Sequence, residues 1–552
     1  ISAGIYQTSM PAEIAQIIQY LKVSAVFCDN QEQVDKVLDV RDQIPNVKKV
    51  IFEDPRGMRD YMSDDWFIDI RDLYKMGEEE HAKNPDIFEA LVDEGKPDDV
   101  CHLCLTSGTT GLPKGTKLTH KNYINMGVQL IQVDPLESTD EYVSFLPFAW
   151  IGEQMNSFGV AMASGITLNF PESVETAMSD LKEIGPHFMF GAPRIYETIR
   201  SQIWLKIDQS YWLNKVFYNY FIKVGIESAG YKMTGKPMPL GLKIKSWLGT
   251  QLIFRPLVNQ IGFLRLRRAY TGGAALGPEL FTFYQAIGVN LKQIYGQTEI
   301  VGIAYMHRDG DVRPETVGKP LPGTTCKISE LGEILSRSDS VTPGYYDLPE
   351  KSEELLEGGW LHSGDAGFID ENGHLVVIDR LSDVMHNNKD EMFSPMFLEN
   401  ALKFSPYIKE AVIYGNKEDF VACLINIDPI VVGKWAEDRG ISFSTYMDLS
   451  GKPEVAQLMM EQVLDVNSRA EKEHFKIKRF ALLYKLLDTD DGELTKTGKI
   501  RRKFVQERYQ NLYDSLYDES VDKKEVEASF QYQDGQSTKV KTSIAFYTVK
   551  GA

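Results

Sequence analysis

Cysteine is scarce in this sequence, with five residues in a chain of 552. An odd number at irregular spacing argues against a disulfide framework and points to a reducing compartment. Two of the five form a lone C-x-x-C at Cys101 and Cys104. Structural zinc needs a second pair of ligands, and a thioredoxin-like site places the motif at the start of a helix. Because this pair lies in an apolar run, we predict a buried strand there.

Long apolar runs and an initiating methionine are also missing. No stretch reaches the ~20 apolar residues that a membrane-spanning helix needs. The nearest, residues 154–170, lacks charge but contains Asn156 and Ser157, so we predict a buried helix and strand. The opening residues read as a turn, a helix over 11–22 and a strand over 23–28, which is the pattern of a domain interior. We therefore expect further sequence before Ile1, where a targeting signal could not be read.

Positive charge is in deficit, since 60 Lys and Arg residues face 79 Asp and Glu residues, a formal net charge of −19. Nonspecific binding to nucleic acid requires clustered cations, so the composition argues against a nucleic-acid partner. An anionic substrate must therefore be held by local donors. Together with the cysteine usage, this favours a cytoplasmic protein.

Strand-like runs and amphipathic helical stretches alternate through the first part of the chain. The runs are residues 23–28, 143–147, 166–170, 187–191 and 289–294. This alternation predicts an α/β fold with largely parallel sheets. From about Lys327 the pattern changes to short strands and turns, with a hairpin signal at 371–373, which predicts a β-rich subdomain.

The length and the changes in pattern predict more than one domain. We expect a large N-terminal domain of mixed sheets over 1–380, a hinge at 381–383 and a small mobile α+β domain over 384–510. In the remainder, 511–552, apolar and polar residues alternate on both sides of Asp534-Gly535. This predicts a β-hairpin extension that packs on the body of the protein in a structural role.

Residues 203–268 are unusual, because they hold eleven Lys or Arg residues against only Asp208 and Glu227. Aromatic residues, including Trp204, Trp212 and Trp247, lie among these cations. Basic and aromatic residues on amphipathic helices suit a peripheral membrane contact, here on the inner face of the membrane. A helical insertion that packs its aromatic residues into the core explains the pattern equally well, and both interpretations stay open.

The stretch LTSGTTGLPKGTKLTH, residues 105–120, is rich in Gly, Thr and Lys. Glycines let the backbone approach an oxyanion, amide and hydroxyl groups donate to phosphate oxygens, and Lys114 adds charge. The spacing G-x-x-x-x-G-K-[ST] of nucleotide hydrolases does not fit, since Pro113 and Thr116 occupy the positions that would need to be Gly. We predict a phosphate-binding loop that serves a different reaction.

Further motifs follow in order: YGQTE at 295–299, GWLHSGDAG at 359–367, DR at 379–380 and LTKTGKIRRKF at 494–504. With them the sequence resembles the adenylate-forming superfamily of acyl-CoA synthetases, nonribosomal-peptide adenylation domains and luciferases. Within that superfamily it is most similar to the bacterial AMP-forming long-chain fatty-acyl-CoA synthetases. The stretches that carry this closer likeness are GAPRIYE at 191–197, TGGAALGPEL at 271–280 and LKFSPYIKEAVIYG at 402–415.

The resemblance implies a nucleotide site drawn from several motifs. Its members are Thr106, Ser107, Gly108, Thr109, Thr110, Gly111, Lys114, Gly272, Gly273, Tyr295, Gly296, Asp365 and Arg380. The loop 106–114 would hold the β and γ phosphates of ATP. Tyr295 and the Gly272-Gly273 backbone would line the adenine. Asp365, assisted by Arg380, would accept hydrogen bonds from the ribose hydroxyls.

The resemblance also assigns catalytic roles. Thr298 would reach the α-phosphate, while Glu299, with Thr106, would bind Mg²⁺. Lys499 would contact both the attacking carboxylate and the α-phosphate, where charge gathers in the transition state. The nucleophiles are a substrate carboxylate and then the thiol of coenzyme A, so no activated Ser, Cys or His is needed.

The family uses two domain orientations for its two half-reactions, with rotation two positions after the motif arginine. That position is Ser382, where relatives often have Asp or Lys, and Asp383 could share the role. Relatives also have a glycine in the turn that lines the pantetheine tunnel, whereas residues 386–395 contain none. Asp390 or Asn388 must then take that turn, since both residue types tolerate left-handed backbone.

The acyl chain is expected near Trp150, Gly191 and Ala274. Trp150 replaces the histidine of many relatives, and an indole suits either an acyl pocket or ordinary core packing. The leading hypothesis is a long-chain fatty acid:CoA ligase that uses ATP, Mg²⁺ and coenzyme A. A fatty acyl-AMP ligase with another acceptor and an inactive lipid- or nucleotide-binding homologue stay open, as does a homodimer.

Overall fold

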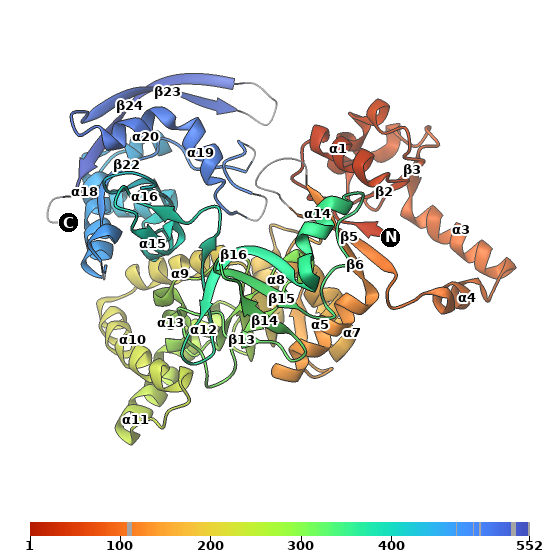
Figure 1. Cartoon of the computed structure of the whole chain (residues 1–552), viewed down its shortest axis with the longest axis horizontal. Helices are drawn as coiled ribbons and strands as arrows, with labels where there is room; N and C mark the ends of the chain where they lie inside the picture. Colours follow the sequence, from red (N-terminus) through yellow and green to blue (C-terminus); the bar gives the residue numbers. More distant parts are fainter. Residues whose placement is uncertain (107–112, 471, 490, 496–497, 532–536, 550–552) are drawn as a thin grey trace.

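The computed structural model describes residues 1–106, 113–470, 472–489, 491–495, 498–531 and 537–549. It has a large N-terminal domain and a smaller C-terminal domain, drawn in blue at the upper left of Figure 1. The predicted α/β fold with a β-rich subdomain is confirmed. None of the helices in these ranges is long and apolar enough to cross a membrane.

The chain opens with a small parallel sheet and its helices. The strands are β2 (Ala25–Cys28), β3 (Lys49–Phe52) and β4 (Phe67–Asp69), and the helices are α1 (Pro11–Leu21), α2 (Gln31–Leu38), α3 (Ile70–Lys83) and α4 (Ile87–Glu94). Apolar faces of α1 and α2 pack on the sheet around Val34, Val50 and Phe52. Helices α3 and α4 extend away from the body, at the right of Figure 1.

Two sheets form the centre of the large domain. The first has the order β1-β5-β6, with β1 (Ser2–Ala3), β5 (Val100–Thr106) and β6 (Lys114–Thr119). The second has seven strands in the order β13 (Lys319–Pro320), β12 (Tyr305–Met306), β11 (Leu291–Tyr295), β10 (Arg268–Thr271), β9 (Phe188–Gly191), β7 (Glu141–Val143) and β8 (Thr167–Asn169). Strands β7 to β11 of this sheet pair in parallel. The predicted buried strand at Cys101–Cys104 is confirmed in β5. The predicted strand over 166–170 forms as β8, but it is not buried, since Thr167 and Phe170 are exposed at the edge of the sheet.

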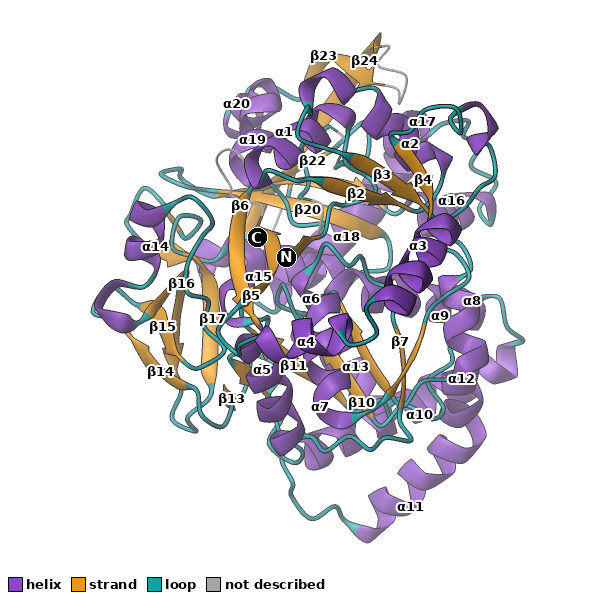
Figure 2. Ribbon diagram, turned by 90° about the vertical axis from the view of Figure 1, so that its right-hand side faces the viewer, coloured by secondary structure: helices purple, strands orange, loops and turns teal. Residues whose placement is uncertain are grey.

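Helices cover both faces of the seven-stranded sheet (Figure 2). They are α5 (His120–Val133), α6 (Ile151–Gln154), α7 (Ala161–Ser164), α8 (Ala177–Ile184) and α13 (Pro278–Ala286), with a π-helical turn at Met155–Val160. Side chains of α5 and α6 meet strand residues such as Tyr142 and Phe190 in one buried cluster. The core therefore lies between the sheet and these helices.

The basic and aromatic segment is a helical insertion. It contains α9 (Pro193–Asp208), α10 (Trp212–Met233), α11 (Leu240–Gly249), a π-helical turn at Thr250–Phe254 and α12 (Arg255–Gln260). Its aromatic residues divide into two groups: Phe221 and Phe254 are buried in the core with α13, whereas Trp212, Phe217 and Trp247 are exposed. Core packing therefore accounts for only part of the segment.

The predicted β-rich subdomain is a four-stranded antiparallel sheet. Its strands are β14 (Thr325–Ile328), β15 (Glu333–Arg337), β16 (Leu361–Ile369) and β17 (Leu375–Arg380), with α14 (Pro349–Leu355) before β16. The predicted hairpin joins β16 to β17, and Gly373 takes positive φ in its turn. This hairpin places Asp365 directly opposite Arg380.

The small domain contains a five-stranded sheet of order β20-β21-β22-β24-β23. The strands are β20 (Ile408–Tyr414), β21 (Val421–Ile427), β22 (Ile477–Leu482), β23 (Lys523–Gln531) and β24 (Ser537–Thr548), with a short pair β18 (Met385–His386) and β19 (Met392–Phe393). Its helices are α15 (Pro395–Lys403), α16 (Pro429–Glu437), α17 (Tyr446–Ser450), α18 (Pro453–Ser468), α19 (Arg502–Arg508) and α20 (Gln510–Tyr517). The predicted C-terminal hairpin is confirmed, and β24 pairs with β22, so the tail continues this sheet.

Candidate nucleotide and acyl-binding site

Strands β5 and β6 carry the two ends of the predicted phosphate loop. They pair antiparallel with Thr106 opposite Lys114, so the ends of the loop lie side by side. The ammonium of Lys114 lies 4.8 Å from the centre of the Tyr345 ring. The remaining predicted members, Ser107, Gly108, Thr109, Thr110 and Gly111, lie outside the described residues.

Glu299 follows β11 in a short 3-10 turn, Thr298–Ile300, and its side chain is buried. Its Oε1 accepts a hydrogen bond of 2.6 Å from the hydroxyl of Tyr345. The buried Nε2 of the neighbouring Gln297 has no hydrogen-bond partner among the described residues. A buried donor without a partner is costly, and a bound phosphate would satisfy it. Tyr345 and Gln297 were not predicted as site residues.

The Glu299 carboxylate is a suitable ligand for Mg²⁺. Among the described residues no cluster of three or more His, Cys, Asp or Glu side chains is arranged to hold a metal ion. Mg²⁺ commonly uses one or two carboxylates and completes its coordination with water and substrate phosphates. A single buried carboxylate near the phosphate loop matches that donor set.

Tyr295, Asp365 and Arg380 form one hydrogen-bonded group. The Tyr295 hydroxyl donates to Asp365 Oδ2 at 2.7 Å, and Arg380 Nε lies 3.1 Å from Asp365 Oδ1. Arg380 Nη1 also donates to the carbonyl of Ser363 at 3.0 Å. Burial, together with the Asp365 carboxylate, raises the pKa of Tyr295 well above its usual value, so the phenol remains a donor. The carboxylate is thereby held in one orientation.

Three of the predicted nucleotide-site glycines have either little room for a side chain or an unusual backbone conformation. A Cβ atom on Gly272 would come 2.6 Å from Ile294 Cγ1, and one on Gly296 would come 2.5 Å from the Gly302 carbonyl oxygen. Gly273 has φ of +86°, a conformation that side chains disfavour. Glycine is therefore favoured at these predicted nucleotide-site positions, by the Ile294 side chain at Gly272, by backbone conformation at Gly273 and by neighbouring backbone at Gly296.

The small domain brings Lys499 to the same group. Its backbone loop is closed by two hydrogen bonds, from Thr495 N to the Lys499 carbonyl at 2.7 Å and from Lys499 N to Thr495 Oγ1 at 3.0 Å. Burial, and then the nearby Arg380 cation, lower the pKa of Lys499 to about 8, while Asp365 and Asp379 oppose the shift. Lys499 is nevertheless exposed in part of its surface.

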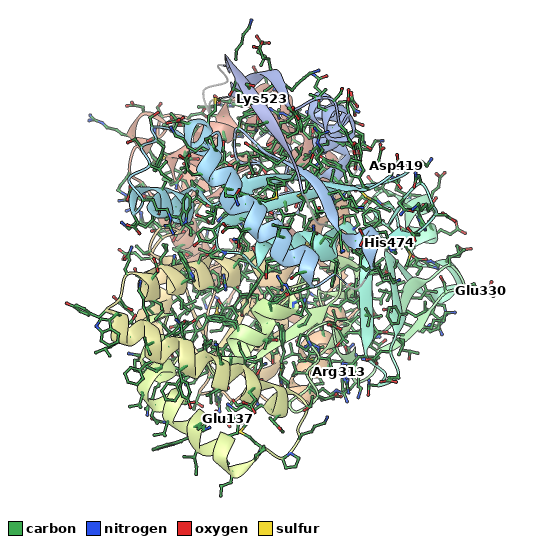
Figure 3. The ribbon with its side chains drawn as sticks, turned by 90° about the vertical axis from the view of Figure 1, so that its left-hand side faces the viewer. Glu137, Arg313, Glu330, Asp419, His474 and Lys523 are labelled. Atoms are coloured by element: carbon green, nitrogen blue, oxygen red, sulfur yellow. The ribbon has the colours of Figure 1, made fainter. Side chains whose placement is uncertain are left out.

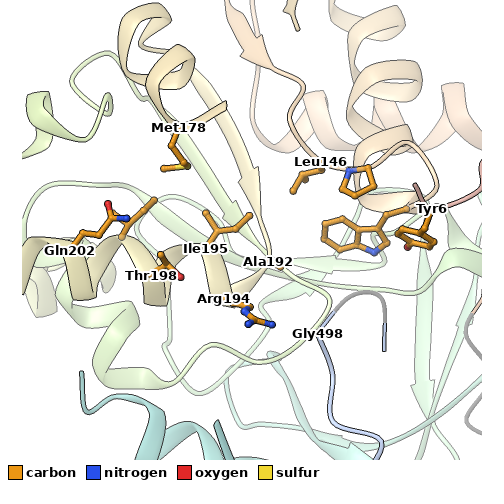
Figure 4. Close-up of a pocket in the computed structure, with 12 residues that line it drawn as sticks. Tyr6, Leu146, Met178, Ala192, Arg194, Ile195, Thr198, Gln202 and Gly498 are labelled. Carbon is orange, nitrogen blue, oxygen red and sulfur yellow. The ribbon is translucent and has the colours of Figure 1, made fainter. Parts of the chain in front are cut away.

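A cavity of about 390 Å³ adjoins this loop (Figure 4). Its lining is Tyr6, Leu146, Pro147, Trp150, Met178, Ala192, Arg194, Ile195, Thr198, Ile199, Gln202 and Gly498. Most of these side chains are apolar, and Gly498 precedes Lys499. Trp150 lies against Phe190 with 5.3 Å between ring centroids. Within the described part of the chain, Gly191 and Ala274 do not line the cavity, although Ala192 does.

The predicted hinge segment, 381–383, lies in a turn. The Ser382 hydroxyl donates to Asp383 Oδ1 at 2.9 Å, and Asp383 N donates to the Arg380 carbonyl at 2.9 Å. Farther along, Asp390 has φ of +62°, which confirms that one of the two expected residues takes the turn without glycine. The β18–β19 pair closes this turn.

Polar contacts join the domains on the side of α9 and α15. Lys403 Nζ lies 3.4 Å from Glu197 Oε1 of the large domain and 3.9 Å from Glu410 Oε2 of its own domain. Asn400 Nδ2 donates to the Ala275 carbonyl at 3.1 Å. These contacts hold the orientation in which Lys499 faces Asp365 and Arg380.

Sequence comparisons agree with this arrangement. A model of the AMP-binding enzyme family matches residues 1–346, and a model of the AMP-binding enzyme C-terminal domain matches residues 382–521. The first match covers more than half of the chain. The chain belongs to the AMP-binding enzyme family. The resemblance to adenylate-forming enzymes is therefore confirmed.

Relatives of this AMP-binding enzyme include fatty-acid–CoA ligases. Long-chain-fatty-acid–CoA ligase ACSBG1 of Rattus norvegicus is 26% identical over 550 residues, covering 94% of this chain and 75% of the relative. Long-chain-fatty-acid–CoA ligase FadD15 of Mycobacterium bovis is 26% identical over 515 residues, covering 92% and 82%. The solved adenylation domain of a carboxylate reductase from Mycobacterium chelonae superimposes with a TM-score of 0.70 at 18% identity, over 94% of this chain and 76% of that one. This likeness concerns the fold.

Proposed function

We propose that this AMP-binding enzyme is a long-chain fatty acid:CoA ligase that forms acyl-CoA, AMP and pyrophosphate from ATP, a fatty acid and coenzyme A. One observation carries the proposal. Lys499 faces the Asp365–Arg380 group, and the glycine before it lines an apolar cavity. An acid whose chain fills that cavity would present its carboxylate near the ammonium.

In the first half-reaction a carboxylate oxygen bonds to the α-phosphorus of ATP, and the bond from that phosphorus to the β-phosphate oxygen breaks. Lys499 would donate to the carboxylate and to a non-bridging α-phosphate oxygen, which stabilises the charge of the transition state. Asp365 would hold the ribose hydroxyls, and Lys114 would hold the outer phosphates. Mg²⁺, bound by Glu299 and the phosphates, would supply neutralisation of the pyrophosphate charge.

In the second half-reaction the thiol sulfur of coenzyme A attacks the acyl carbonyl, AMP departs with the bonding electron pair, and the thiol proton passes to solvent. We place the hinge at 381–383, where the Ser382 and Asp383 turn lies between the large domain, 1–380, and the rest of the chain. Rotation there would separate Lys403 from Glu197 and move Lys499 away from the nucleotide.

Two features support a long-chain acid and coenzyme A. The cavity is lined largely by apolar side chains, and each buried methylene contributes ~0.8 kcal/mol at most, so we expect a preference above about ten carbons. The left-handed Asp390 keeps a tight turn in the segment expected to line the thiol tunnel. Relatives named as fatty-acid–CoA ligases favour the same substrates.

Pyrophosphate exchange and thioester formation, measured across acids of increasing length, test the proposal. A fatty acyl-AMP ligase with another acceptor would exchange labelled pyrophosphate into ATP but form no thioester with coenzyme A. An inactive homologue would do neither. A preference for acetate or an aryl acid would reject the long-chain assignment while leaving the adenylation chemistry intact.

A further inference from the structure

Helix α10 is apolar on two faces. Its inner face, with Phe221, Val224 and Ala229, is buried in the core beside α13. Its outer face exposes Trp212, at 69%, and Phe217, at 51%. A helix in water normally has polar residues on the side away from the core. Core packing therefore does not account for the exposed apolar residues on the outer face of α10.

Helix α11 pairs with α10 and has a second exposed apolar stripe. Small residues bring the helices together: Ser246 Oγ donates to Ser228 Oγ at 3.0 Å, and a Cβ atom on Gly249 would come 2.7 Å from Phe221. The exposed residues of the pair, which we call the α10–α11 surface, include Trp212, Val216, Phe217, Tyr220, Ile244 and Trp247. The pair projects from the body in Figures 1 and 2, and in Figure 3 it lies at the end of the molecule opposite Lys523.

Charge distinguishes this surface from another exposed apolar face. Residues 211–254 contain six lysines and one acidic residue, Glu227, in a chain whose net charge is −19. Helix α4 also exposes apolar residues, including Phe88 at 66% and Leu91 at 62%. The α3–α4 region, 70–94, however, contains eight Asp or Glu residues and three Lys or Arg residues. The two faces are similar in exposed apolar side chains and opposite in charge.

We propose that the α10–α11 surface docks on an anionic lipid bilayer, with its aromatic residues at the level of the headgroups. Trp and Tyr suit that boundary because they combine an apolar ring with a polar tip, and exposed lysines such as Lys243 and Lys245 attract anionic lipid. A second copy of this chain fits poorly, because two surfaces rich in lysine would repel each other.

Helix α9 connects the cavity to the α10–α11 surface along the chain. Helix α9 lines the cavity through Ile195, Thr198 and Ile199, and it ends at Asp208, four residues before α10 begins. If the proposed function holds, docking would bring a cavity for apolar acids close to the membrane in which such acids dissolve. Lipid binding itself does not depend on that function.

Flotation of the full chain with vesicles tests the proposal. Vesicles of phosphatidylcholine doped with phosphatidylglycerol are compared with phosphatidylcholine alone, at low and high salt. We expect binding that requires the anionic lipid and weakens with salt. The triple substitution Trp212→Ser, Phe217→Ser and Trp247→Ser should reduce the partition coefficient about tenfold or more, as should Lys243→Glu with Lys245→Glu.

The matched control is Phe88→Ser with Leu91→Ser on α4, which should leave binding unchanged. Thermal unfolding and pyrophosphate exchange with a dissolved acid should be unchanged in all three variants, because the substituted side chains are exposed and outside the catalytic site. Absence of binding by the unaltered chain, or equal binding by the triple variant, would overturn the proposal. A dimer in sedimentation that the triple variant abolishes would also overturn it, since the surface would then be an interface between copies.

Discussion

Lys499 of the small domain lies close enough to Asp365 and Arg380 for their charges to affect its pKa. Its replacement by alanine should slow adenylate formation about 10²- to 10³-fold, because a preorganised donor to the transition state is lost. Pyrophosphate exchange measures this step. Thioester formation from supplied acyl-adenylate should change little, and exposed Lys503→Ala should leave both steps intact. Adenylation at full rate in the alanine variant would remove the proposed mechanism.

The protonation of Lys499 predicts a pH dependence. The pKa is lowered to about 8 in the folded protein, so the ammonium loses its proton, and the site loses its donor, as the pH rises through that value. We expect kcat/KM for adenylation, which reports the free enzyme, to fall above about pH 8. Bound ATP adds negative charge that favours the ammonium, so the corresponding fall in kcat should occur at higher pH. In Lys499→Arg the fall in kcat/KM above pH 8 should disappear. If it is unchanged, another group is responsible for it.

Tyr345 should control how Glu299 presents its carboxylate. The hydroxyl of Tyr345 donates to Glu299 Oε1 at 2.6 Å, so Tyr345→Phe would leave that buried oxygen without its donor. Loss of such a supporting hydrogen bond commonly weakens metal affinity about 10- to 100-fold. The Mg²⁺ dependence of pyrophosphate exchange should shift accordingly. Tyr346→Phe, the adjacent residue, serves as control, and equal Mg²⁺ dependence in both variants would contradict the role.

The motif residues could be located from the sequence because their types and spacing are typical of a nucleotide site. The structure brings Tyr295, Asp365 and Arg380 into contact, although their nucleotide roles stay predictions. Tyr345 could not be found in this way, because it lies in an irregular segment and meets Glu299 across 46 positions in the chain. Nothing in its sequence surroundings distinguishes it from Tyr346.

Helices α9 and α15 meet across the domain boundary through Lys403 and Glu197. Glu197→Gln should weaken the orientation that delivers Lys499, while Glu410 still accompanies Lys403 within the small domain. We expect pyrophosphate exchange to fall severalfold with little change in thioester formation from supplied acyl-adenylate. The control is Glu437→Gln, which alters an exposed pair inside the small domain. A proportional loss of both steps would indicate general destabilisation instead.

Local sequence patterns predicted individual strands and helices, but they did not predict which elements pair or pack with one another. Alternating apolar residues predicted the C-terminal hairpin, but its pairing with β22 joins Ala481 to Phe546 across a long stretch of chain. In the basic insertion, composition alone could not divide the aromatic residues into buried and exposed sets. That division depends on how α10 packs against α13, a contact that no local pattern encodes.

The molecule as a whole should unfold in more than one step, because the small domain has its own core. Phe546→Ala removes a buried ring of that core and should lower its stability by about 3 to 5 kcal/mol. Calorimetry should show a shifted transition for the small domain and an unchanged one for the large domain. Phe368→Ala, at an exposed strand position, should shift neither, and a single shared transition would show that the domains unfold together.

Delivery of Lys499 by a separate domain has a consequence for the direction of the reaction. A group that lowers the barrier to acyl-adenylate formation lowers the reverse barrier equally, so a fixed ammonium would also help pyrophosphate to regenerate ATP. The proposed rotation of the small domain would remove Lys499 from the nucleotide and so withdraw this help from the reverse reaction. Without the ammonium, re-formation of ATP from acyl-adenylate and pyrophosphate would be slow. The acyl-adenylate would then react with the thiol in preference to pyrophosphate.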